Sequence, residues 1–213
     1  MTAAKQHLLN GTMDYLLAHG AGPISLRQLA AALGTSHRML IYHFGSKEGL
    51  LIQVVRAMER RQREIFAELD VESEVSPEDL ARRFWQRLAD PANWPHARLF
   101  FELYGRALQG DSCAAPLLDG IVESWLAPLS EWISRQGVPP PAAHATARLG
   151  VAVSRGLLLD LLATGDREGV DAAMEQFISM YRRYRSTMHR HDGGALRGQA
   201  INADQSGPAR PPR

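Results

Sequence analysis

The sequence predicts an all-α fold of about nine helices, and three observations lead to this prediction. Apolar residues recur at helical spacing through most of the chain between residues 4 and 189. Capping residues and helix breakers divide this pattern into segments of ordinary helix length. No segment shows the apolar–polar alternation that is typical of a strand. With 213 residues, 45% of them apolar, the chain can form one domain or two small ones with a normal core.

The first helix is expected over residues 4–19. Ala21-Gly22-Pro23 should end it, because glycine and proline at adjacent positions favour a turn. The side of this helix that should be buried consists of Leu8, Leu9, Met13, Leu16 and Leu17.

Residues 25–34 predict a second, short helix that ends at a glycine. Ser25 is a good N-cap, and Gln28 three residues later completes a capping box. Gly34 follows the last apolar residue, where a helix often ends in a left-handed conformation. One apolar face is formed by Leu26, Leu29, Ala30 and Leu33.

Residues 35–45 predict a third helix directly after this turn. Thr35 or Ser36 can cap it, and Leu40 and Phe44 are four residues apart and can pack on the second helix. Two short helices joined by a glycine turn form a helix-turn-helix, whose second helix typically lies in the DNA major groove. The alternative for the pattern alone is an ordinary pair of core helices in another α-helical protein.

The rest of the chain predicts six further helices. Ser46 should cap a helix over 46–69, in which residues 59–64 are expected to be a solvated charged stretch. Ser76-Pro77-Glu78-Asp79 is a strong helix start, and Asp90-Pro91 should end that helix. Pro128 should kink the helix in which it lies. The remaining helices are expected over 94–108, 115–135, 142–163 and 167–189, and the apolar-poor segment 191–213 is expected to be disordered.

The residues of this motif are more specific than those of a generic helix-turn-helix. LIYHFGSKEGLL at 40–51, preceded by AAALGTS, resembles the N-terminal domain of the tetracycline-repressor (TetR) family of bacterial transcription regulators. The resemblance covers roughly residues 5–60, and beyond them only the helical architecture and length agree. It implies a DNA-binding domain over 1–46 and a ligand-binding and dimerisation domain over 47–190, with 46–69 as the linking helix.

One position departs from the family pattern. The family usually has Leu-Tyr-x-His-Phe, whereas this chain has Leu40-Ile41-Tyr42-His43-Phe44, so Ile41 occupies the place of a DNA-contacting tyrosine. Ile41 could pack on a thymine methyl group, or Tyr42 could reach the DNA backbone instead.

The resemblance and the motif together give a set of candidate DNA contacts. Arg38 is best suited to read guanine, because its guanidinium matches the O6 and N7 acceptors, and His37 and Met39 are further candidates for base edges. Residues 1–63 hold eight Lys or Arg against three Asp or Glu, which suits phosphate attraction. The full candidate set is Ser25, Arg27, Ser36, His37, Arg38, Met39, Ile41, Tyr42, His43 and Lys47.

The middle helices are rich in aromatic residues, which is compatible with an apolar pocket for a small molecule. The alternative for each aromatic residue is an ordinary place in the core. The predicted lining is Phe84, Leu88, Phe100, Leu103, Tyr104 and Trp125, and the candidate polar groups are His96, Arg98, Glu102 and Arg106.

The last two helices should form an antiparallel hairpin, and two such hairpins can pack as a four-helix bundle across a two-fold axis. The resemblance implies that this is the dimer interface, although these faces could instead be buried within one subunit. The predicted interface residues are Leu149, Val153, Leu157, Leu161, Met174, Phe177 and Tyr181.

Several classes of protein are not expected. There is no metal-ligand spacing, glycine-rich phosphate loop or nucleophile elbow, so we expect no metal, no cofactor and no enzymatic activity. The single Cys113 excludes an internal disulfide and favours a reducing compartment; a structural thiol is the plainer reading, and a redox sensor the alternative. No signal peptide is visible and the densest apolar run, 156–163, is too short to span a bilayer, which favours a cytoplasmic protein with no membrane partner.

These observations favour a ligand-responsive transcription regulator, most often a repressor. It would bind a near-palindromic double-stranded DNA operator as a homodimer and be released by an unknown small apolar or aromatic molecule. The alternative is a helical small-molecule-binding module without specific DNA recognition.

Overall fold

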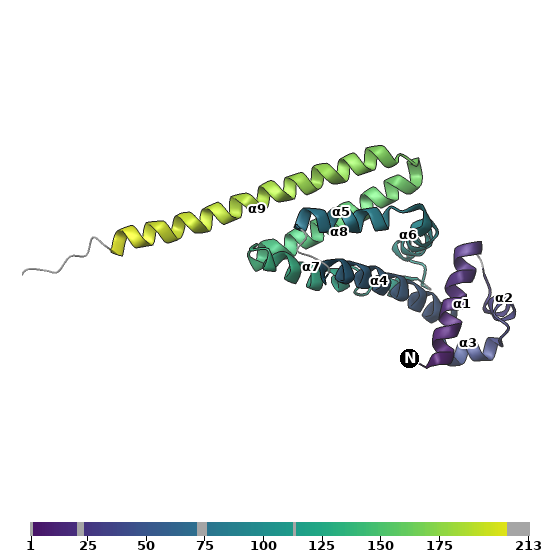
Figure 1. Cartoon of the computed structure of the whole chain (residues 1–213). Coiled ribbons are helices and arrows are strands. Elements are labelled where there is room, and N and C mark those ends of the chain that lie inside the picture. The colour runs from purple at the N-terminus through teal and green to yellow at the C-terminus, as the bar shows by residue number, and fades with distance from the viewer. Residues whose placement is uncertain (1, 21–23, 72–75, 113, 204–213) are drawn as a thin grey trace, which may run out of the picture.

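The computed structural model describes residues 2–20, 24–71, 76–112 and 114–203. Within these ranges the regular structure is helical throughout, as predicted, with nine α-helices and two short 3-10 helices (Figure 1). In the described part of the chain, no helix has both the length and the apolar character needed to cross a membrane. The breaker expected at 21–23, Cys113 and the segment from residue 204 onward lie outside the described residues.

The helices follow one another with short connections, and their bounds agree with most of the predicted ranges. In chain order they are α1 (Ala3–His19), α2 (Leu26–Ala32), α3 (His37–Phe44), α4 (Lys47–Val71), α5 (Pro77–Leu88), η1 (Pro91–Asn93), α6 (Trp94–Leu108), η2 (Ala115–Leu117), α7 (Glu123–Arg135), α8 (Pro140–Thr164) and α9 (Arg167–Ala203).

Two bounds differ from the expectation. The helix expected from residue 115 begins only at Glu123, because Pro116 lies in the separate helix η2 and Gly120 has a left-handed φ of +73° that interrupts the chain. The segment expected to be disordered from residue 191 instead continues α9 as far as Ala203. No proline occurs there before Pro208, so every residue keeps the amide that continues the helical hydrogen bonds.

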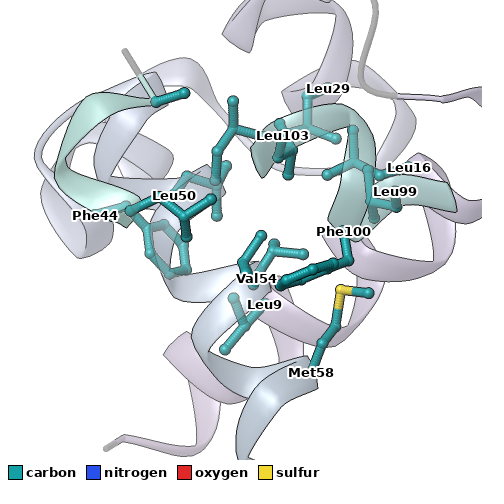
Figure 2. Close-up of a cluster of buried hydrophobic side chains, with 14 of the residues drawn as sticks. Leu9, Leu16, Leu29, Phe44, Leu50, Val54, Met58, Leu99, Phe100 and Leu103 are labelled. Atoms are coloured by element: carbon teal, nitrogen blue, oxygen red, sulfur yellow. The ribbon is translucent and has the colours of Figure 1, made fainter. Parts of the chain in front are cut away.

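The N-terminal helices and α6 share one apolar core, with α4 running between them. Figure 2 shows side chains of α1, α2 and α3 meeting those of α4 and α6 around one interior. The N-terminal helices α1–α3 are therefore packed directly against the C-terminal helices as well as joined to them through α4. The labelled members of this core are Leu9, Leu16, Leu29, Phe44, Leu50, Val54, Met58, Leu99, Phe100 and Leu103.

Polar contacts hold α5 against α9 on the far side of the molecule. The Arg82 guanidinium pairs with Glu175 through two nitrogens, and Trp85 Nε1 donates to Asp171 Oδ1 at 2.6 Å. Further along, Arg185 donates to the buried carboxylate of Glu78 at 2.9 Å. Figure 1 shows α9 continuing past α5 and projecting beyond the other helices.

Candidate DNA-binding and ligand-binding sites

The recognition helix α3 turns one face inward and leaves the other face to solvent. Leu40 and Phe44 are buried, at 1% and 8% exposure. Tyr42 is 79% exposed and Ile41 is 37% exposed. The exposed members of the predicted DNA-binding set on this helix are His37, Arg38, Met39, Ile41 and Tyr42.

Capping interactions fix where α2 and α3 begin, as the sequence predicted. Ser25 and Gln28 form the full capping box, with Gln28 N donating to Ser25 Oγ at 3.2 Å and Ser25 N donating to Gln28 Oε1 at 3.0 Å. Ser36 Oγ accepts from Met39 N at 3.2 Å. Gly34, between the two helices, has a φ of +63°, which residues with a Cβ rarely adopt. The turn therefore sets the direction in which α3 presents its first residues.

His43 and Lys47 are less exposed than the outer residues of α3. The His43 ring is half-buried, lies 5.0 Å from the Tyr42 ring, and has its Nε2 buried without a hydrogen-bond partner among the described residues. Lys47 is half-buried at the start of α4, and Arg27 is exposed on the first turn of α2. Arg27 and Lys47 therefore lie on the helices that come directly before and after α3 in the chain.

A cavity of about 440 Å³ lies among the C-terminal helices, within the range typical of small-molecule sites. Its wall contains side chains of α4, α5, α6, α7, α8 and α9, and also Met13 of α1. Four of the predicted lining residues border it, namely Phe84, Leu88, Phe100 and Trp125.

Two predicted lining residues do not border the cavity. Leu103 is 1% exposed and belongs to the core shared with the N-terminal helices. Tyr104 stacks on Phe100 of the wall, with the two ring centroids 5.5 Å apart. The two residues lie three and four positions after Phe100 on α6, but this helix has apolar neighbours on more than one side, so sequence spacing did not separate the cavity side from the core side.

Of the four predicted polar groups on α6, one borders the cavity and three do not. His96 borders the cavity, whereas Arg98, Glu102 and Arg106 do not. The Arg98 guanidinium lies 5.7 Å from the Trp94 ring, and Arg106 pairs with Asp111 at 2.7 Å. These two contacts of Arg98 and Arg106 are local to α6 and the loop that follows it.

A charged network centred on Glu59 closes one part of the cavity wall. The Glu59 carboxylate, on α4, accepts a hydrogen bond from Trp125 Nε1 of α7. It also lies 3.4 Å from Arg155 Nη2 of α8 and 3.7 Å from Arg63 Nη1. The Arg155 guanidinium lies over the Phe100 ring, 5.2 Å from its centroid. This network ties the linking helix to three helices of the cavity.

Three buried polar atoms at the cavity have no hydrogen-bond partner among the described residues: Gln62 Oε1, His96 Nδ1 and Tyr181 Oη. Burial lowers the pKa of His96, because the imidazolium form loses its hydration, and the charge of Asp14 opposes this effect. Burial likewise raises the pKa of the Tyr181 hydroxyl. Both side chains are therefore favoured in their neutral forms.

Several residues of this wall were not predicted from the sequence. The stretch 59–64 was expected to be solvated, but Glu59, Gln62 and Arg63 are half-buried, and Glu59 and Gln62 border the cavity. Phe66 and Trp132 also border it and pack edge to face, with centroids 5.7 Å apart. The apolar residues Ile65 and Phe66, which follow Gln62, were the only local signal that this side of α4 is covered.

The predicted dimer residues do not form one exposed stripe. Leu149 is 55% exposed, Val153 and Leu157 are half-buried, and Leu161 is fully buried against α5 and α9. The reason is helical geometry: each step of four residues rotates by about 40° beyond a full turn, so this series winds from the outside to the core. On α9, Met174 is buried, and Phe177 and Tyr181 border the cavity.

A different series on the same two helices is exposed. We call it the α8–α9 seam: its large apolar members are Leu149, Leu159, Met180 and Tyr184, which are 37–57% exposed. Small exposed residues lie between the two leucines on α8, namely Ala152 and Gly156.

Comparison with known proteins agrees with this architecture. Residues 8–54 match the profile of the Bacterial regulatory proteins, tetR family. A transcriptional regulator from Rhodococcus sp. Rha1 superposes with a TM-score of 0.68 at 21% identity, covering 84% of this chain and 95% of that one. A TetR transcriptional regulator from Legionella pneumophila gives 0.63 at 17% identity, covering 85% and 98%.

A third solved structure is from Saccharomonospora viridis, in complex with choline, with a TM-score of 0.59 at 20% identity, covering 85% of this chain and 96% of that one. No curated protein sequence matches the chain significantly. The capped helix-turn-helix lies within the matched segment, and the described helices beyond it have the fold of solved regulators. Over residues 8–54 the chain is therefore similar to the tetR family of bacterial regulatory proteins, and its described helices have the fold of solved transcriptional regulators.

Proposed function

We propose that the protein is a cytoplasmic, homodimeric repressor that leaves its operator when a small apolar or aromatic molecule enters the cavity. One observation carries this proposal: the exposed recognition helix and the cavity are built on the same apolar core. Leu40 and Phe44 of α3 and Phe100 of the cavity wall all belong to that core. A ligand that shifts the wall therefore acts on side chains that also support α3.

The outer face of α3 supports reading of a half-site in the major groove. Arg38 is the reader of a guanine, and His37 and Met39 contact neighbouring base edges. Arg27 and Lys47, on either side of α3, hold phosphates and so fix the orientation of the helix. Ile41 packs on a thymine methyl group, and the strongly exposed Tyr42 reaches the DNA backbone.

The α8–α9 seam supports a symmetric dimer. Leu149, Leu159, Met180 and Tyr184 offer an apolar surface on two antiparallel helices, and the small Ala152 and Gly156 allow a partner helix to approach closely. Two such hairpins pack into a four-helix bundle about a two-fold axis. This pairing presents two copies of α3, which suits a near-palindromic operator.

Release by a ligand follows from linkage between the two sites. A molecule that binds the cavity better in the form that does not fit DNA weakens operator binding, and the operator weakens its binding by the same factor. The cavity volume of about 440 Å³ suits a drug-sized molecule. The choline complex of the S. viridis structure supports small-molecule binding within this fold.

Operator recognition is tested by comparing Arg38→Ala with Lys47→Ala. The operator is first defined by selection from random duplex DNA with the unmodified protein. Arg38→Ala is expected to weaken operator binding by about 1–3 kcal/mol and to relax the preference at one base pair. Lys47→Ala is expected to weaken binding to all sequences alike and to lower the salt dependence, because it removes a phosphate contact.

Fluorescence anisotropy at several salt concentrations separates these effects. Unchanged base preference in Arg38→Ala would show that another residue reads the base. If no sequence is enriched by selection, the chain is a small-molecule-binding module without specific DNA recognition. Addition of candidate ligands to the preformed complex then tests release.

The dimer is tested by Leu159→Arg, which places a charge in the α8–α9 seam. We expect sedimentation to show monomers and operator affinity to fall by about tenfold or more, since a buried unpaired charge disfavours association. Leu108→Arg is the matched control, because Leu108 is 61% exposed at the end of α6, away from the seam. A Leu159→Arg protein that stays dimeric would place the interface elsewhere.

A further inference from the structure

Four aromatic rings of the cavity wall contact one another. The Phe66 ring meets Phe84 at 5.2 Å and 84°, and Phe84 meets Trp125 at 5.8 Å and 52°. Trp132 completes this row on the other side of Phe66, at 81°. Rings arranged edge to face attract a further ring in the same way, because a ring edge is electropositive and a ring face electronegative. The wall therefore favours a flat aromatic guest.

The charged side chains at the cavity are already paired with other side chains of the protein. Glu59 is paired with Arg155 and Arg63, and Arg61 is paired with Glu68 at 3.1 Å. His96 is favoured as the neutral ring, because its burial lowers its pKa. A charged guest would lose its hydration and find no free counter-charge among these groups, which makes its transfer into the cavity unfavourable.

The unpaired polar atoms at the cavity come from three different helices. Gln62 lies on α4, His96 on α6 and Tyr181 on α9, and each has a buried polar atom without a protein partner. Buried polar groups are rarely left unpaired, because the loss of water is then uncompensated. Gln62 Oε1 accepts a hydrogen bond, whereas His96 Nδ1 and Tyr181 Oη can each donate or accept one. A hydroxyl group, which does both, is the guest group that matches all three.

We propose that the cavity binds an uncharged, flat aromatic molecule carrying hydroxyl groups, held by Gln62, His96 and Tyr181 against the row of aromatic rings. This proposal rests on the proposed function, since it names the chemical class of the inducer. Unlike a purely apolar ligand, such a molecule must form a hydrogen bond with at least one of these three side chains. It also excludes organic cations and carboxylates as the best ligands.

Calorimetry on the full-length protein at neutral pH tests the class with matched probes. The probes are 2-naphthol, naphthalene, 2-naphthoate and 2-naphthyltrimethylammonium, which share one ring system and differ in polarity and charge. We expect 2-naphthol to bind about tenfold or more tightly than either ion, and more tightly than naphthalene. Equal or tighter binding of either ion, or no binding of any probe, would overturn the proposal.

The variants Tyr181→Phe, Gln62→Met and His96→Leu test the three partners one at a time. At least one is expected to reduce the preference for 2-naphthol over naphthalene by about threefold to tenfold, the effect of one lost hydrogen bond. Naphthalene binding in the same variant reports whether the cavity keeps its shape. His144→Leu is the matched control for His96→Leu, because His144 is an exposed histidine of α8 outside the cavity.

If no variant changes the preference, water satisfies these polar atoms and the proposal is overturned. Operator release is measured separately with the same probes. If 2-naphthol binds as expected but leaves the DNA complex intact, the ligand class stands and the inducer role fails.

Discussion

Glu59→Ala is expected to lower the free energy of unfolding by about 3 kcal/mol, because it leaves charged and polar groups without their partner. Glu59 is 12% exposed in its side chain, and it pairs with Arg155 at 20% and Arg63 at 25% exposure. It also accepts the indole hydrogen bond of Trp125. Loss of one partner of a buried pair is reported to cost about 3–5 kcal/mol, and the partial exposure of both arginines places this case at the lower end.

Urea unfolding of Glu59→Ala and Glu64→Ala provides the measurement. Glu64 lies on the same helix and pairs with Arg61, but both side chains are about 60% exposed, so its loss is expected to cost less than about 1 kcal/mol. A double change, Glu59→Ala with Arg155→Met, should recover part of the loss, since the unpaired guanidinium is then removed as well. Equal effects of Glu59→Ala and Glu64→Ala would contradict a structural role of the network.

Leu40→Ala is expected to destabilise the N-terminal helices by about 2–5 kcal/mol and to weaken binding to operator and random DNA together. Leu40 is 1% exposed and joins α3 to the core, so its truncation leaves a cavity beneath the recognition helix. Its neighbour Ile41 points outward at 37% exposure. Ile41→Ala should change stability by less than about 0.5 kcal/mol while reducing operator binding alone.

Thermal unfolding and DNA titration of the two variants distinguish a residue that packs in the core from one that contacts the operator. The pair is well matched, because both residues are aliphatic and adjacent on one short helix. If Ile41→Ala left operator affinity unchanged, the position usually held by tyrosine would have no contact role in this protein. If Leu40→Ala were as stable as the unmodified protein, the packing of α3 on this core would be wrong.

The helix-turn-helix could be predicted from sequence because its determinants are local. Ser25, Gln28 and Ser36 act within three residues of their partners, and Gly34 meets a backbone requirement at its own position. The burial of Leu40 and Phe44 followed from their spacing of four. Such signals need no knowledge of the distant chain.

The cavity could be predicted only in part, because its wall is a product of tertiary packing. Phe84, Phe100 and Trp125 were predicted from the aromatic character of the middle helices, and they border the cavity together with Leu88. Tyr181 was instead assigned to the dimer interface, since spacing on α9 shows that it lies on an apolar side but not which neighbour covers that side. The polar Gln62 carried no sequence signal at all.

Met13 gives the cavity a property that a separate ligand domain would lack. This residue of α1, within the segment matched to the DNA-binding family profile, forms part of the cavity wall. A ligand in contact with Met13 would touch the N-terminal helices directly, as well as the helices of the cavity. Under the proposed function, the choice of ligand and the strength of the response are therefore linked through Met13. A substitution at position 13 that reshapes the cavity for a new ligand also changes how α1 packs on its neighbours. Any redesign of this protein as a sensor therefore has to select for ligand binding and for operator release together.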